Sequence, residues 1–170
     1  MDDLIYNQTR IPKEEYRYGL RSSAATGCGW IAAFNALRLM GYQVDKQALI
    51  RYFERQLPLI HGNAGTSFWG PAEYFRHWGF PVKMVVNRKK YDETLRGADV
   101  GILFYRWHQG IRLGAHFVAV KHENGSFMGY NTYRYSTGAD GYGPSLEAYI
   151  KRQGWFGTVL IAIERKKTAP

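Results

Sequence analysis

The chain has too few cysteines for a disulfide framework or a cysteine-based metal site. Among its 170 residues there is one cysteine, Cys28, so an intramolecular disulfide is excluded. Zinc sites built on cysteine need at least two thiolates, and the five histidines show no ligand spacing. We therefore expect no metal and no organic cofactor. A lone thiol is typical of a reducing compartment, and we expect the protein to be cytoplasmic.

Long apolar runs, repeats and low-complexity tracts are also missing. No segment approaches the ~18 apolar residues of a membrane span, and residues 1–4 have neither the basic nor the apolar region of a secretory signal. We therefore expect no membrane association. Hydrophobic residues make up 45% of the chain and aromatic residues 16%, which is enough for one sizeable core. Residues 1–170 are predicted to form a single domain.

Acidic residues are the minority among the charged ones. The chain has 23 Lys and Arg against 14 Asp and Glu, a formal net charge of +9. The basic residues are scattered, no helical pattern has a basic face, and no RRM-like or zinc-finger signature is present. Nucleic-acid binding is therefore disfavoured, although the positive field could steer acidic ligands.

The first half of the chain has the periodicity of helices. Apolar residues recur at steps of three and four over 24–40, which predicts a helix capped by Thr26. Most of its other positions are apolar too, so we expect it to be the buried central helix. A second helix is predicted from the cap Asp45 and a third from Pro71, with a surface loop over 57–69 between them.

The second half has the short β-rich runs of a sheet. Within it, Glu123-Asn124-Gly125-Ser126 predicts a type I′ hairpin, because Asn-Gly accepts positive φ angles. A short helix over 145–151 is expected before the last strand. The predicted class is α+β, with a mostly antiparallel sheet packed on the helix that carries Cys28. The strands are expected at 82–86, 100–107, 116–122, 127–133 and 157–163.

Cys28 lies in Thr26-Gly27-Cys28-Gly29-Trp30, where a loop enters the central helix. The free N–H groups and positive dipole of a helix N-terminus stabilise a thiolate, so we expect a lowered thiol pKa. The flanking glycines would leave the sulfur sterically open. A lone cysteine on an apolar helix is more often inert core packing, so Cys28 needs partners before it indicates catalysis.

The hairpin supplies two such partners, His116 and Asn131. His116 opens its first strand, and the hairpin register puts Asn131 opposite Val118, one same-face diagonal from His116. Alone, His116 could be an ordinary strand histidine and Asn131 a strand-end cap. Together with a thiol at a helix N-terminus, they form the Cys-His-Asn arrangement of covalent acyl transfer.

These segments occur in the order found in one known superfamily. They are Gly27-Cys28-Gly29-Trp30 leading into 31–37, then Ala115-His116-Phe117-Val118, then 124–127, and finally Tyr130-Asn131-Thr132-Tyr133. In them the chain resembles the papain-like cysteine peptidases, most closely the compact bacterial C39-like peptidases.

The resemblance implies a papain-like fold and a peptidase acting on a peptide or protein substrate. It implies that Cys28 is the nucleophile, His116 the general base and acid, and Asn131 the residue that orients the imidazole. C39-like members more often carry aspartate in that last place, whereas papain uses asparagine.

One feature of that family is missing. Papain-like enzymes usually have a glutamine several residues before the cysteine to donate to the oxyanion, and residues 18–24 contain none. Loss of one such donor typically costs about 10²–10³ in rate. The leading substitutes are Ser22 and Gln8. Four further side chains are candidates for a substrate groove, although Trp30 fits the core equally well: Trp30, Trp69, Trp107 and His108.

Other functions stay open. A catalytically inactive papain-like domain that binds peptides or a protein partner would tolerate the missing glutamine. The same residues could pass an acyl group to an amine, as in an acyltransferase. A cell-wall amidase of the NlpC/P60 type also has a cysteine at a helix start, but it usually carries an Asp-Cys-Ser-Gly-type motif and is exported.

Overall fold

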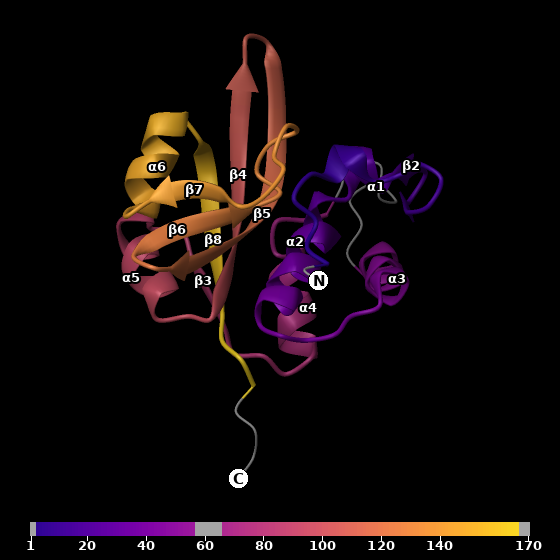
Figure 1. Ribbon diagram of the computed structural model, residues 1–170, viewed down its shortest axis with the longest axis horizontal. Helices are drawn as coiled ribbons and strands as arrows, with labels where there is room; N and C mark the ends of the chain where they lie inside the picture. The colour runs from indigo at the N-terminus through magenta and orange to yellow at the C-terminus, as the bar shows by residue number, and fades with distance from the viewer. Residues whose placement is uncertain (1–2, 57–65, 167–170) are drawn as a thin grey trace.

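The computed structural model describes residues 3–56 and 66–166 and has an α+β fold (Figure 1). Its main sheet has six antiparallel strands in the order β3-β8-β4-β5-β6-β7. These strands are β3 (Val82–Val85), β4 (Val100–Gln109), β5 (Arg112–Glu123), β6 (Ser126–Tyr130), β7 (Asp140–Gly143) and β8 (Phe156–Ile163). A small second sheet pairs β1 (Arg17–Tyr18) with β2 (Arg21–Ser22).

The helices form two groups, one on each face of the main sheet (Figure 1). Side chains of β5 alternate between them: Phe117 and Ala119 pack with the central helix, and Val118 and Val120 pack on the opposite face. One group is α1 (Ser23–Thr26), α2 (Cys28–Leu39), α3 (Lys46–Gln56) and α4 (Gly70–His77); the other is α5 (Tyr91–Arg96) and α6 (Leu146–Gln153). Two short 3₁₀ helices, η1 (Gln8–Arg10) and η2 (Arg88–Lys90), complete the elements.

The predicted helix over 24–40 is in fact two helices that meet at Gly27. Gly27 ends α1, with its N–H bonded to the carbonyl of Ser23, and precedes the first residue of α2 without a side-chain cap. The prediction that Thr26 caps the helix is therefore wrong. The Thr26 hydroxyl is buried inside the last turn of α1 and has no hydrogen-bond partner among the described residues. Cys28 is consequently the first residue of α2.

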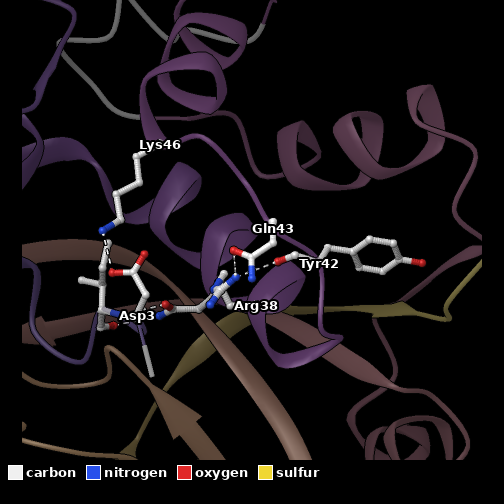
Figure 2. Close-up of polar contacts among 7 residues, drawn as sticks. Asp3, Arg38, Tyr42, Gln43 and Lys46 are labelled. Atoms are coloured by element: carbon white, nitrogen blue, oxygen red, sulfur yellow. Dashed lines mark hydrogen bonds and ion pairs between the residues drawn. The ribbon is translucent and has the colours of Figure 1, made fainter. Parts of the chain in front are cut away.

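The α2 helix is buried on most sides, as predicted, and its far end is tied to the chain that follows. Arg38 donates to the carbonyl of Tyr42 and to Oε1 of Gln43 (Figure 2). Lys46, at the start of α3, pairs with Asp3 at 2.9 Å in the same view. These contacts join α2, α3 and the N-terminal segment.

Three local predictions are confirmed. The Asp45 carboxylate accepts from the N–H groups of Gln47 and Ala48 at the start of α3, and Pro71 lies in the first turn of α4. Ser145 caps the predicted short helix, α6. Of the loop predicted over 57–69, residues 57–65 lie outside the described residues.

The hairpin between β5 and β6 also follows the prediction. Asn124 and Gly125 have φ angles of 51° and 76°, and Ala119 pairs with Tyr130. However, β6 ends at Tyr130 rather than at residue 133, because Asn131 adopts a φ of 73° and turns the chain away from β5. The β5 residues before Ala119 therefore do not pair with β6.

Several elements were not predicted, including α5, the two-stranded sheet and β7. The β7 segment, Asp140–Gly143, contains two glycines and lies at the sheet edge, so it lacks the apolar alternation of a strand. Among the described residues, no helix is long and apolar enough to cross a membrane.

Candidate active site

A cleft of about 720 Å³ lies where β5 extends past the end of β6. It is lined by the N-terminus of α2, the 3₁₀ helix η1, the strands β4 and β5, and the segment that follows β6. Six of the nine site residues expected from the sequence line it: Cys28, His116, Asn131, Gln8, Trp107 and His108.

The Cys28 thiol is held at the N-terminus of α2. Burial raises its pKa, and this effect outweighs the hydrogen bonds to sulfur from the backbone N–H groups of Phe117, Gly29 and Cys28 itself. The expectation of a lowered thiol pKa is therefore wrong in direction. The helix N-terminus does supply N–H donors, but burial in the protein favours the uncharged thiol over the thiolate.

The glycines beside Cys28 are required by packing rather than by access to the sulfur. A Cβ on Gly29 would lie 2.3 Å from the Thr66 hydroxyl oxygen. A Cβ on Gly27 would lie 2.6 Å from both the Ser23 carbonyl and the Trp30 ring nitrogen. None of these three neighbours, Thr66, Ser23 and Trp30, presents the far end of a long flexible side chain. Only glycine therefore fits at either position.

The imidazole of His116 is oriented by a main-chain carbonyl. Its Nε2 lies 2.7 Å from the carbonyl oxygen of Asn131. Since a carbonyl only accepts, Nε2 carries the proton of the neutral ring, and Nδ1 keeps the free lone pair that a general base needs. Burial lowers the pKa of His116, the charge of Arg134 adds to that effect, and the Asn131 hydrogen bond opposes it.

The Asn131 side chain has a different partner from the one expected. Its Oδ1 accepts from the backbone N–H of Gln8 at 2.8 Å, and its Nδ2 donates to Oε1 of Gln8 at 3.1 Å. The expected diagonal contact with His116 assumed that β6 continues through residue 133. Because the chain turns at Asn131, its carbonyl rather than its amide faces the imidazole.

Gln8 brings a side-chain amide to the cleft from the N-terminal segment. Its Nε2 donates to the carbonyl of Ala24 at 3.1 Å, which leaves the second hydrogen of this amide group uncommitted. Gln8 lines the cleft together with Cys28. The other leading substitute, Ser22, pairs with Arg17 in the small sheet and is not among the described residues of the cleft.

Of the four candidates for a substrate groove, two line the cleft and two are not among its described residues. Trp107 and His108 line the cleft from β4. Trp30 is fully buried in the core and donates from Nε1 to the Ser23 hydroxyl at 3.1 Å. Trp69 is 46% exposed and packs against Phe68, and it is not among the described cleft residues.

Some cleft residues were missed by the sequence interpretation. Tyr105 is the β4 partner of His116, and their rings meet edge to face with centroids 5.7 Å apart. Arg134 and Tyr135 follow Asn131 closely in the sequence, so they could have been proposed as cleft residues from that proximity. Tyr105 could be found only by knowing how β4 pairs with β5.

Burial favours the uncharged forms of both the thiol and the imidazole. A thiolate–imidazolium pair needs a thiol pKa below that of the imidazole, whereas here burial moves the two apart. Consistently, Cys28 and His116, both in the described part of the chain, share no hydrogen bond.

The direction of these shifts predicts the pH dependence of thiol alkylation. The thiolate of Cys28 should form only above the ~8.5 of a free cysteine, because its pKa is raised. We expect iodoacetamide labelling, followed by intact mass spectrometry from pH 4 to 10, to be slow at pH 7 and to rise above pH 8.5. His116→Ala should slow the labelling, because it lacks the base, but should leave the pH at which labelling rises unchanged. A labelling shoulder near pH 5 that vanishes in His116→Ala would show an ion pair instead.

The fold and the cleft define an α+β protein in which Cys28, His116 and the side-chain amides of Gln8 and Asn131 share one cavity. In the described part of the chain, no group of three or more His, Cys, Asp or Glu side chains could hold a metal ion. No protein-family model matches the sequence, and the search of curated proteins finds no match.

Proposed function

We propose that the protein is a papain-like cysteine peptidase that hydrolyses an amide bond of a peptide or protein substrate. The observation that carries this proposal is the meeting of Cys28, His116 and Gln8 in one cleft, with Nε2 of His116 bound to the Asn131 carbonyl. These groups meet the three needs of acyl transfer, which are a nucleophile, a base and an oxyanion donor.

In the proposed acylation step, Nδ1 of His116 takes the proton of the Cys28 thiol as the sulfur attacks the scissile carbonyl. The new C–S bond converts the carbonyl oxygen to an oxyanion, which accepts from the Cys28 backbone N–H and from Nε2 of Gln8. When the C–N bond breaks, His116 gives its proton to the leaving amine, and a thioester remains on Cys28.

Deacylation reverses these roles. A water molecule gives a proton to Nδ1 of His116 as its oxygen attacks the thioester carbonyl, and the second oxyanion uses the same donors. The C–S bond then breaks, the sulfur recovers its proton from His116, and the acid product leaves. The uncharged resting thiol and imidazole suit this route, because His116 takes up a proton only as the sulfur attacks the amide and again as water attacks the thioester.

One observation favours a second candidate, a papain-like domain that binds a peptide or a protein partner without cleaving it. A thiol with a raised pKa and no hydrogen bond to His116 is what an inactive member would show. An acyltransferase would use the same residues and differ only in replacing water with an amine.

Covalent trapping separates the first two candidates. We expect a peptidyl vinyl sulfone to add once to the wild-type protein at pH 7, at Cys28, as seen by intact mass. Cys28→Ala should not react, and His116→Ala should react about 10²-fold more slowly, because it lacks the base. If the wild-type protein and His116→Ala react at equal rates, the thiol is not activated and the binding domain is the better assignment.

A further inference from the structure

Among the described residues that line the cleft, one side chain carries a permanent charge, and it is positive. Arg134 lies three residues after Asn131 and lines the cleft, where its side chain is exposed. No Asp or Glu is among the described residues that line the cleft. None of the ion pairs in the described part of the chain involves Arg134.

The segment that carries Arg134 is anchored on both sides. The carbonyl of Arg134 accepts a short hydrogen bond from Nδ2 of Asn7, which ties the segment to the N-terminal arm. The rings of Tyr133 and Tyr135 stack with centroids 5.0 Å apart, and the Tyr133 hydroxyl bonds to that of Tyr149 on α6. The main chain that carries Arg134 is therefore held in place at the cleft that Cys28 and His116 also line.

The charge of Arg134 reaches the imidazole of His116. It is one of the two causes that lower the pKa of His116, so the guanidinium lies within electrostatic range of the imidazole. An anion bound to Arg134 would lie at a similar range, and it would cancel part of the repulsion that an imidazolium feels during the reaction. Arg binds carboxylates through two parallel N–H donors, which fixes their orientation as well as their charge.

Resting on the proposed peptidase function, we infer that the substrate carries a carboxylate near its scissile amide and that Arg134 binds it. The carboxylate is either an Asp or Glu side chain or the C-terminal carboxylate of a short peptide. The aromatic side chains of Trp107 and Tyr135 line the same cleft and suit an apolar neighbour of that carboxylate.

Matched peptides test this inference and separate the two sources. One series compares Glu with Gln at each position flanking the cleaved bond, and the other compares a free C-terminal acid with its amide. We expect one of the acidic peptides to exceed its neutral partner in kcat/KM by about 10- to 100-fold, the effect of a charge-assisted hydrogen bond. Arg134→Gln should remove this preference, and Arg134→Glu should favour Lys over Glu at that position.

Arg152 offers a matched control. It lies on α6 with its guanidinium over the Tyr149 ring, and it is not among the described cleft residues. Arg152→Gln should keep the full preference for acidic peptides. Equal rates for acidic and neutral peptides in the wild-type protein would overturn the inference and leave the peptidase proposal standing.

Binding to Cys28→Ala keeps the test independent of turnover. Fluorescence anisotropy with labelled acidic and neutral peptides should show the same preference in Cys28→Ala, and Arg134→Gln in that background should abolish it. If acidic peptides bind more tightly but the wild-type protein neither cleaves them nor reacts with the vinyl sulfone, the peptidase proposal is refuted. The binding of an anionic ligand by Arg134 is then still supported. Equal binding of both peptides would refute the role of Arg134.

Discussion

Replacing His116 with alanine should lower kcat/KM for peptide hydrolysis by about 10⁴-fold or more, since the loss of one member of a catalytic triad costs about 10⁴–10⁶. In the proposed mechanism, Nδ1 of His116 is the base in acylation, and the same ring is the acid that releases the amine. The hydrogen bond from Nε2 of His116 to the Asn131 carbonyl fixes this tautomer of its ring. Among the described residues of the cleft, the other histidine, His108, has no such bond. Steady-state kinetics on the best peptide measures the loss.

A second histidine on the same strand provides the control. His122 lies near the other end of β5, where its ring packs against Phe127 with centroids 4.8 Å apart, and it is not among the described cleft residues. We expect His122→Ala to keep the wild-type kcat/KM, and thermal melting to show that both variants fold. If His116→Ala loses less than about tenfold, general-base catalysis by this residue is refuted.

Replacing Gln8 with alanine should lower kcat by about 10²–10³-fold and change KM little. The oxyanion exists only after attack, so a donor to it stabilises the transition state without adding to substrate binding. Gln8→Glu keeps the shape but has no N–H donor, and its carboxylate would face the Ala24 carbonyl that now accepts from Nε2. We expect it to be as slow as Gln8→Ala. Gln153→Ala, a change to another glutamine of the same cleft, should leave kcat unchanged.

Asn131→Gly tests how Gln8 is held. Glycine accepts the φ of 73° and keeps the carbonyl that binds His116, while removing the side chain that binds Gln8. If the Asn131 side chain acts through Gln8, the double variant with Gln8→Ala should be no slower than Gln8→Ala alone. If the factors by which the two single substitutions lower the rate multiply in the double variant, the Asn131 side chain acts on the imidazole instead.

The hairpin and two of the helix caps were predictable from the sequence because they depend on neighbours in the chain. Asn124-Gly125 sets the turn, and the turn sets the register that pairs Ala119 with Tyr130. Asp45 and Ser145 mark the starts of α3 and α6 through hydrogen bonds to N–H groups two or three residues later. The α+β class followed from these pieces.

The pKa directions were not predictable in this way. The location of Cys28 at a helix N-terminus indicated a lowered thiol pKa, and that local effect is present in the N–H groups that donate to the sulfur. Burial beneath β5 acts in the opposite direction and prevails. Burial depends on the packing of the whole chain around the thiol, which no local motif encodes.

The α+β class, the hairpin register and three residues of the cleft, Cys28, His116 and Asn131, followed from the sequence alone. Only the tertiary structure decided which atoms of these residues meet: the Asn131 carbonyl binds His116, and its amide binds Gln8, which lies 123 positions earlier in the chain. It also decided that Arg134 lines the same cleft. The physical reason is that local hydrogen bonds follow from residue identity, whereas contacts between distant segments follow from how the helices pack on the sheet.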